Sequence, residues 1–263
     1  MYPVDQVGIC DFDSYAILWY GNYWKYYKRM LMLHFDAYSI EKMHQMLYVT
    51  PVQWKNRGSI CLKVTEKKGK CKYAVALFWY VGETIYNALY LSIESKKDVG
   101  IDTLTDSEQQ MFRKLKIPFR MPKKNVAKFS QNATIYEDCM NGSYISEHTC
   151  LNLFEQMRTD SFGGQTNLSE LSSQYGFTIV VAKMHDLRFY LVPVRLGQTI
   201  SCQMIMTRQI GNMCFEFHQQ IMCDDKVLAE AVIMLCIFDP EKKTLVDLPD
   251  AYFERFSTTV EWF

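Results

Sequence analysis

The stretch from Lys70 to Glu94 reads KCKYAVALFWYVGETIYNALYLSIE, and it sets the fold class. Two runs rich in β-branched and aromatic residues flank a short polar turn, Val81-Gly82-Glu83-Thr84. This pattern predicts a β-hairpin. A second stretch has the same plan: Asn212 to Met222, a turn at Cys223-Asp224-Asp225-Lys226, then Val227 to Phe238. The sequence therefore predicts an antiparallel sheet in each half of the chain.

A short strand and a helix precede each sheet. In the first half, a strand at Val7 to Asp11 comes before a helix from about Asn22 to His34. In the second half, a strand at Ala133 to Glu137 comes before a helix from about Glu147 to Arg158. This order of elements predicts an α+β fold in which a helix covers one face of each sheet.

A further short helix is predicted at Leu168 to Gln174, in the second half only. It would begin after Asn167, because Asn is a good N-cap residue. It would end before Gly176, because Gly readily adopts the left-handed conformation that closes a helix.

The closing segments of the two halves also match. Leu104-Thr105-Asp106-Ser107 leads to Phe112, and Leu248-Pro249-Asp250-Ala251 leads to Phe256. Both Leu and both Phe are 144 residues apart (248 − 104 and 256 − 112). Internal similarity of this kind indicates a duplicated unit. We therefore predict an N-terminal domain at residues 1–115, a linker at 116–128 and a C-terminal domain at 129–263.

The connection between the halves, Ser95 to Lys128, carries a basic cluster that includes Pro122-Lys123-Lys124. Such a cluster could attract a phosphate-bearing ligand. More often it is a solvated linker, and we interpret it so.

The composition excludes several classes of function. The 29 basic and 29 acidic residues balance, which argues against a nucleic-acid binder. The nine cysteines form no CxxC pair and several lie in apolar runs, so we expect reduced, buried thiols and neither disulfides nor zinc. The histidines share no metal-ligand spacing, so we expect no metal site.

The sequence has no run close to the ~18 apolar residues that a membrane span needs. Its start, Met1-Tyr2-Pro3-Val4-Asp5, has the features of neither a signal peptide nor a transit peptide. We therefore expect a cytoplasmic protein. An organellar location stays open for a chain that has lost a presequence.

Three motifs in the second half resemble the 4-hydroxybenzoyl-CoA thioesterase family of hotdog proteins. Leu153-Phe154-Glu155-Gln156-Met157-Arg158 resembles the family's aromatic-Glu-x-x-Arg helix. Tyr190 to Gln198 resembles its Tyr-x-x-Pro-x-x-x-Gly-Asp strand and turn, with Gln198 in place of the Asp. Phe238-Asp239-Pro240 and Leu248-Pro249 resemble its closing strand and tail. The resemblance runs from about Asn132 to Phe256.

The first half resembles the same family at another motif. Asp11-Phe12-Asp13-Ser14-Tyr15-Ala16-Ile17-Leu18-Trp19-Tyr20-Gly21-Asn22-Tyr23 is similar to the pattern Asp-x-Asp-x-x-Gly-(apolar)2-aromatic-aromatic-x-Asn-Tyr. The family's catalytic Asp falls on Asp13, and Ala16 replaces the usual Gly.

The resemblance implies two hotdog domains, each an antiparallel sheet wrapped around a central helix, that form an intramolecular pseudodimer as in plant-type acyl-ACP thioesterases. It implies a thioesterase acting on acyl-CoA or acyl-ACP, in fatty acid metabolism, with active sites where the domains meet. CoA or phosphopantetheine would enter as part of the substrate, and no separate cofactor is expected. Further homo-oligomerisation through hotdog surfaces stays open.

The resemblance also assigns site residues. Asp13 would act as general base or nucleophile, and the backbone N–H of Tyr20 would stabilise the oxyanion. The substrate would contact Asn22 and Tyr23 in the first half, and Arg195, Gly197 and Gln198 in the second.

Each assignment has a structural alternative. Asp13 could be a solvated Asp that caps a turn or a helix. Asp138 and Asn141 are weak candidates for a second site, and so is Glu147, which could instead only favour the positive end of its helix. The many aromatic residues of the first half could form a ligand cage, although core packing is the more frequent role of such residues.

Two functions are therefore compatible with the sequence. The first is a thioesterase, favoured by Asp13 beside Tyr20 and Asn22. The second is a hotdog scaffold without catalysis, or an acyl-thioester-binding subunit of a larger assembly. Ala16, Gln198 and the irregular second motif around Asp138 favour this alternative, because fold alone does not fix function.

Overall fold

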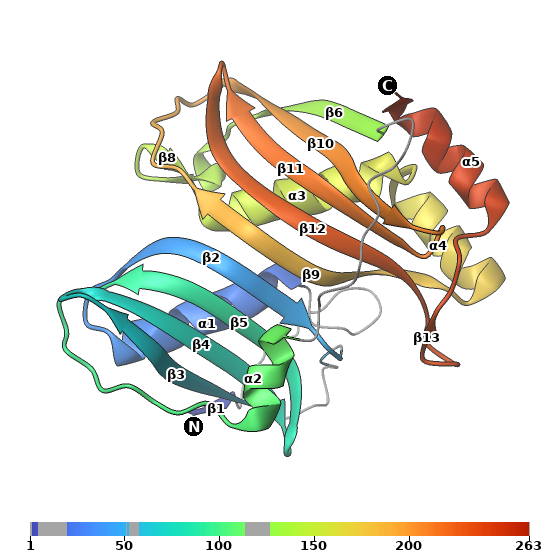
Figure 1. Ribbon diagram of the computed structural model, residues 1–263. Helices are drawn as coiled ribbons and strands as arrows, with labels where there is room; N and C mark the ends of the chain where they lie inside the picture. Colours follow the sequence, from blue (N-terminus) through green and yellow to red (C-terminus); the bar gives the residue numbers. More distant parts are fainter. Residues whose placement is uncertain (1, 5–19, 51, 53–57, 114–126, 263) are drawn as a thin grey trace. The chain divides into compact units, whose positions relative to one another are not determined.

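The computed structural model describes residues 2–4, 20–50, 52, 58–113 and 127–262 (Figure 1). The chain forms two compact units, one of residues 1–117 with 183–186, the other of residues 118–182 with 187–263. The predicted strand at Val7 to Asp11 and most of the predicted linker, 116–128, lie outside the described residues. Each unit contains one long helix and an antiparallel sheet.

The sheet of the first unit has the strand order β1-β3-β4-β5-β2, and each neighbouring pair is antiparallel. The hairpin predicted at 70–94 is confirmed as β4 and β5 with Gly82 and Glu83 between them. The predicted helix is confirmed as α1, Tyr20–His34. The strands of this sheet are β1 (Tyr2–Val4), β2 (Ser39–Tyr48), β3 (Gly58–Lys68), β4 (Lys72–Val81) and β5 (Thr84–Glu94).

Helix α1 covers one face of this sheet. Five of its buried side chains recur at the spacing of one helix face: Tyr23, Tyr26, Tyr27, Met30 and Leu31. They pack on the alternate residues of β4 that point to that face, because successive side chains of a strand point to opposite sides. Trp79 is one of these residues, and its ring lies 5.3 Å from that of Tyr23 and 5.4 Å from that of Tyr26.

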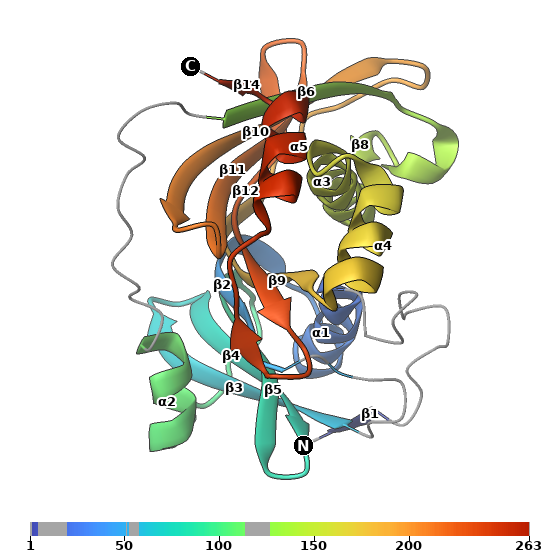
Figure 2. The same cartoon turned by 90° about the vertical axis from the view of Figure 1, so that its right-hand side faces the viewer.

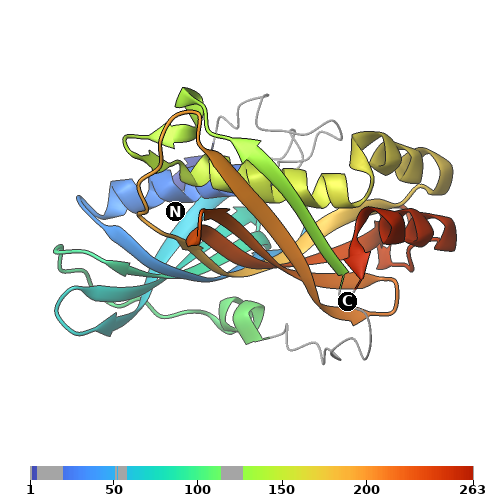
Figure 3. The same ribbon diagram turned by 90° about the horizontal axis from the view of Figure 1, so that it is seen from above.

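A second helix, α2 (Asp106–Arg113), lies on the opposite face of the same sheet (Figure 3, α1 in blue and α2 in green). Its Phe112 contacts Phe78 and Tyr90, which alternate with the residues that face α1. A small apolar core lies beneath it, made of Ala76, Phe78, Ile85 and Ala88 with Leu104 and Met111. The first unit is therefore packed on both faces of its sheet.

The sheet of the second unit has the strand order β9-β12-β11-β10-β6-β14, with β13 on β12. The second predicted hairpin, 212–238, is confirmed as β11 and β12. A small hairpin of two short strands precedes the long helix α3. The strands are β6 (Ala127–Thr134), β7 (Met140–Asn141), β8 (Tyr144–Ile145), β9 (Thr178–Phe189), β10 (Thr199–Ile210), β11 (Cys214–Cys223), β12 (Lys226–Asp239), β13 (Thr244–Leu245) and β14 (Glu261–Trp262).

Helix α3 (Glu147–Ser161) is the central helix of the second unit and confirms the helix predicted there. It begins at Ser146, whose hydroxyl accepts a hydrogen bond from the backbone N–H of Thr149 at 3.1 Å. Helices α4 (Gly164–Tyr175) and α5 (Asp250–Thr259) lie beside it (Figure 2).

Two local predictions were wrong. The short helix α4 does not start after Asn167. Its N-cap is Gly163, in the left-handed conformation, and the Asn167 side chain instead donates to the Phe162 carbonyl at 3.3 Å. Residues 190–194 form no strand: β9 ends at Phe189, and Pro193 in this segment has no N–H for a sheet ladder. The predicted stop at Gly176 is confirmed.

The matched closing segments form helices that begin at equivalent positions, Asp106 and Asp250. Their packing differs. Phe256 of α5 stacks on Phe162, at the end of α3, with 4.7 Å between ring centroids, and it also contacts Phe215 of β11. Helix α5 therefore lies on the same face of its sheet as α3, whereas α2 lies on the face opposite α1. The sequence match predicted that the two segments are equivalent, but neither their helical structure nor their position on the sheet.

None of the helices in the described part of the chain is long and apolar enough to cross a membrane.

Candidate functional site

The first part of the candidate site is the N-terminal end of α1, which begins at Tyr20. The first four backbone N–H groups of a helix have no partner within it, and the helix dipole makes this end positive. Tyr20 is the first described residue of α1, and the role of its backbone N–H as the oxyanion donor stays a prediction. Asp13, with Asp11 and Ala16, lies outside the described residues.

Asn22 and Tyr23 lie in the first turn of α1, and both are buried. The Tyr23 hydroxyl accepts a hydrogen bond from the backbone N–H of Val52 at 3.2 Å. Its ring packs edge-on against Tyr48, at 5.5 Å between centroids. Tyr23 therefore fixes the start of α1 against the sheet, and a contact of this residue with substrate stays a prediction.

A buried polar row lies on the α1 face of the first sheet, and the sequence analysis did not single it out. Trp79 and Asn87 face each other across β4 and β5, and both are fully buried. The Tyr27 hydroxyl donates to Asn87 Oδ1 at 2.5 Å. Burial, with a smaller effect of Tyr23, raises the pKa of Tyr27 well above its usual value, so Tyr27 stays a protonated donor.

Two donors of this row, Asn87 Nδ2 and Trp79 Nε1, have no hydrogen-bond partner among the described residues. The indole nitrogen lies over Gly58, where a Cβ atom would come within 2.2 Å of it. Gly58 is therefore required by the position of Trp79. The sequence sign of this buried polar row was Asn87, an Asn in the middle of an apolar strand. Burying an unpaired amide is costly, so an Asn at such a position indicates a polar partner or role.

The second part of the candidate site is the turn from Arg195 to Gln198, before β10. Gly197 has φ 76°, a left-handed conformation that favours Gly, and the Gln198 N–H donates to the Arg195 carbonyl at 3.1 Å. The Gln198 side chain accepts from the Arg195 N–H at 3.0 Å and donates to Asp224 at 3.5 Å. Gln198 thus closes the turn, and the Arg195 side chain is exposed to solvent.

The three weak candidates lie close together in the segment before and at the start of α3. Asp138 and Asn141 are exposed, and Glu147 is half-buried as the first residue of α3. The segment is joined to the 195–198 turn by hydrogen bonds, because the Gly197 N–H donates to the Ile135 carbonyl at 2.9 Å. The second unit therefore groups these candidates with Arg195, Gly197 and Gln198.

The aromatic-Glu-x-x-Arg motif has a structural role in this chain. Arg158 is 4% exposed, and its guanidinium donates to Gln219 Oε1 at 2.8 Å and to Glu155 at 2.5 Å. The Gln219 amide in turn donates to the Phe154 carbonyl at 3.0 Å. Because the buried charge is paired and hydrogen-bonded, it fixes α3 to β11.

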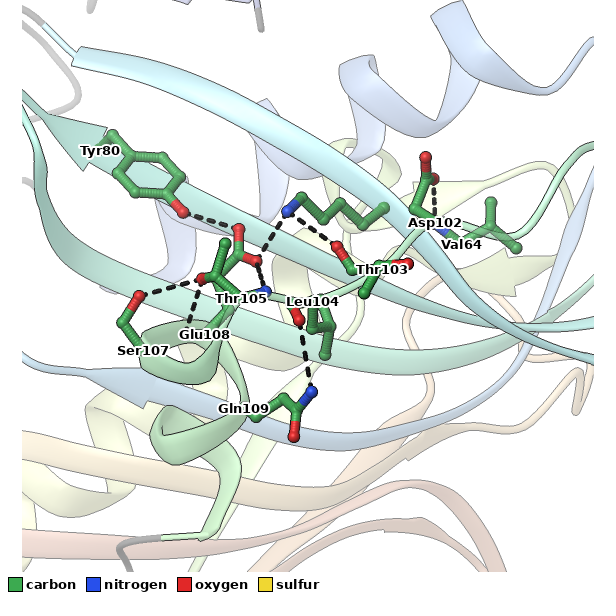
Figure 4. A network of polar contacts seen from close by, with 10 residues as sticks. Val64, Tyr80, Asp102, Thr103, Leu104, Thr105, Ser107, Glu108 and Gln109 are labelled. Atoms are coloured by element: carbon green, nitrogen blue, oxygen red, sulfur yellow. Dashed lines mark hydrogen bonds and ion pairs between the residues drawn. The ribbon is translucent and has the colours of Figure 1, made fainter.

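A polar network around Glu108 is shown in Figure 4. Glu108 accepts hydrogen bonds from Lys63 at 2.7 Å, from Tyr80 at 2.8 Å and from the Thr105 N–H at 2.7 Å. The Thr105 hydroxyl accepts from the Glu108 N–H at 3.3 Å, which completes a capping box at the start of α2. Burial alone would raise the pKa of Glu108, but these hydrogen bonds outweigh it and hold the pKa below its usual value.

This network is structural, since both carboxylate oxygens of Glu108 are occupied by donors from the chain. It attaches α2 to the sheet. The adjoining chain is held too: Asp102 accepts from the Val64 N–H at 2.9 Å, along the edge of β3. The sequence signal was the pair Thr105 and Glu108, a Thr-x-x-Glu capping pattern.

Within the described residues, no group of three or more His, Cys, Asp or Glu side chains could hold a metal ion.

No protein-family model and no curated protein matches the sequence. Among solved structures, the chain is similar to a protein provisionally named an oleoyl thioesterase from Lactobacillus plantarum. The identity is 9%, the TM-score is 0.58, and the match covers 89% of this chain and 95% of that chain.

The chain is equally similar to an acyl-ACP thioesterase from Bacteroides thetaiotaomicron. Here the identity is 6%, the TM-score 0.58 and the coverage 89% of this chain and 96% of that chain. At such identities the likeness shows the fold alone. Because it spans both halves, it confirms the predicted fold class: the chain consists of two hotdog domains and resembles the tandem hotdog thioesterases.

Proposed function

We propose that the protein hydrolyses acyl thioesters of CoA or of an acyl carrier protein. The observation that carries the proposal is the fold likeness over 89% of the chain to two proteins named thioesterases. The resemblance of residues 11–23 to the family's catalytic motif also supports it.

In the proposed reaction, Asp13 acts on the thioester carbonyl. As general base it takes a proton from a water molecule, whose oxygen attacks the carbonyl carbon. The C–S bond then breaks, and the thiolate of CoA or phosphopantetheine leaves and takes up a proton. As nucleophile, Asp13 would form an anhydride that water then hydrolyses.

The negative charge that develops on the carbonyl oxygen needs a donor. The backbone N–H of Tyr20, at the positive end of α1, is suited to this, since fixed dipoles stabilise a developing oxyanion without rearrangement. We propose Asn22 and Tyr23 as substrate contacts beside it, and Arg195, Gly197 and Gln198 as contacts with the substrate from the second unit. Asp138, Asn141 and Glu147 are the alternatives if Asp13 is inactive.

A hydrolysis assay tests the proposal. The full-length protein is given short, long and aromatic acyl-CoAs and an acyl-ACP, and the released thiol is followed with a thiol reagent. Turnover of at least one thioester above the rate in buffer is expected. The absence of turnover with all of them would contradict the proposal.

The alternative is a hotdog protein that binds acyl thioesters without cleaving them. One observation favours it: Gln198, where the family has Asp, is engaged in closing its own turn and in a bond to Asp224. Calorimetry with a non-hydrolysable acyl-CoA analogue separates the two functions. Binding without hydrolysis of the matching thioester would support the alternative.

A further inference from the structure

Two cysteine thiols lie against each other in the second unit. Cys214 and Cys236 are direct partners in the pairing of β11 with β12. Their sulfur atoms are 3.0 Å apart, and each residue is 2% exposed. A disulfide bond is about 2.05 Å long, so the sulfurs would need to approach by roughly 1 Å to form one.

The pair lies at the open end of the β11–β12 hairpin. Here the residues just before β11 are hydrogen-bonded to the segment that precedes α5. Next to Cys214, the Leu248 N–H donates to the Asn212 carbonyl at 2.9 Å, and the Ile237 N–H donates to the Met213 carbonyl at 2.8 Å. A covalent bond at this place would join the strands at the end opposite their tight turn at Asp224. It would also enclose the residues between positions 214 and 236, which restricts the unfolded chain.

We propose that Cys214 and Cys236 are a redox-sensitive dithiol that forms a reversible cross-strand disulfide on oxidation by a peroxide. The fold holds both sulfur atoms next to each other before any reaction. The thiol of one cysteine is therefore in place to attack the sulfenic acid of the other and form the disulfide. The expected consequence is a stiffer, more stable second unit whenever the protein meets oxidant.

The chemistry balances with hydrogen peroxide as oxidant. The Cys214 thiolate attacks one peroxide oxygen, the O–O bond breaks, and Cys214 becomes a sulfenic acid while water leaves. The Cys236 sulfur then attacks the Cys214 sulfur, the S–S bond forms, and the sulfenic oxygen leaves as a second water with the thiol proton. Two thiols are oxidised by two electrons, one peroxide is reduced, and a dithiol reductant reverses the change.

The order of attack follows from the contact between the two thiols. The hydrogen bond from Cys236 lowers the pKa of Cys214, and the same bond, with burial, raises the pKa of Cys236. Cys214 is therefore the first of the two to ionise. Because both thiols are buried, we expect the reaction to be slow and to need brief opening of the hairpin end.

Cys223 provides a matched control. It is buried at the other end of the same strand, and its partner across the pair is Lys226, not a cysteine. Its thiol would be oxidised, if at all, without a resolving thiol on the opposite strand. Cys139, which is half-buried, reports whether the peroxide dose is sufficient.

The experiment treats the reduced full-length protein with hydrogen peroxide until Cys139 is oxidised. The protein is then unfolded, remaining thiols are blocked with N-ethylmaleimide, and peptides are mapped by mass spectrometry. A peptide pair joined through Cys214 and Cys236, lighter by two hydrogen atoms and separated by a reductant, is expected in wild type and in Cys223→Ala. It should be absent from Cys214→Ala and Cys236→Ala.

Thermal unfolding gives a second measurement. The Tm of oxidised wild type and of oxidised Cys223→Ala should lie above that of the reduced protein, and the Cys236→Ala variant should show no such rise. Blocked, unlinked Cys214 and Cys236 in wild type would overturn the proposal. So would a linked form whose Tm does not exceed that of the reduced protein.

Discussion

Tyr27 and Asn87 are a buried hydrogen-bonded pair between α1 and β5, as Arg158 and Gln219 are between α3 and β11. In each hotdog unit, buried side-chain hydrogen bonds thus join the central helix to the sheet within an apolar interface. Neither pair was predicted from the sequence, because the partners are 60 and 61 residues apart and only three-dimensional packing brings them together.

We predict that Tyr27→Phe destabilises the protein by about 1–3 kcal/mol, because Asn87 would be left buried without its donor. Denaturant unfolding measures the change. The double variant Tyr27→Phe/Asn87→Leu should recover part of the loss, since removing both polar partners is less costly than removing one. Equal stability of Tyr27→Phe and wild type would show that the hydrogen bond does not stabilise the fold.

At the level of elements, the helices and hairpins were predictable where a local signal defines them. The Gly176 stop was predicted from a cap residue, whereas the segments of α2 and α5 were recognised only as matching positions in the two halves. The faces on which α2 and α5 pack were not predictable, because a small helix with one apolar side fits either face of a sheet. The run at 190–194 was expected to be a strand from its resemblance to the family motif, but β9 ends at Phe189 and Pro193 has no N–H for a sheet ladder.

Helix α2 gives a pH-dependent prediction through Glu108. Its pKa in the folded protein lies below the ordinary value of 4.5, so its charged form stabilises the fold. This contribution is fully present above the unfolded pKa and is lost as the pH falls through the folded pKa. The free energy of unfolding of wild type should therefore fall more steeply than that of Glu108→Gln from pH 6 down to about pH 3. Parallel curves for the two proteins would contradict this assignment.

The different positions of α2 and α5 give a second prediction. Phe256 of α5 is 1% exposed and packs between Phe162 and Phe215, whereas Phe112 of α2 is half-buried. Phe256→Ala should cost roughly 3–5 kcal/mol, as large-to-small changes in a core do, and Phe112→Ala clearly less. The two variants are compared by chemical denaturation. Equal losses for the two variants, or a smaller loss for Phe256→Ala, would contradict this difference in packing.

At the scale of the molecule, duplication was the most informative sequence signal. Two hairpins with one helix before each predicted two α+β units, and the fold likeness over 89% of the chain to two proteins named thioesterases confirms this fold class. The candidate site was less predictable. The Gly197 turn has the local structure that its motif implies, but Asp13 lies outside the described residues, and local structure is shared by catalytic and non-catalytic hotdog proteins.

The most direct test of the proposed function is hydrolysis by Asp13→Asn beside Asp11→Asn and wild type. The thioester is one that wild type cleaves, and folding of each variant is checked by its Tm. The amide of Asn keeps the size of Asp but cannot act as base or nucleophile. We predict a roughly 10²–10⁴-fold loss of kcat for Asp13→Asn at an unchanged Tm, and a much smaller loss for Asp11→Asn. Hydrolysis by Asp13→Asn at the wild-type rate would contradict the account and would move the chemistry to Glu147 or Asp138.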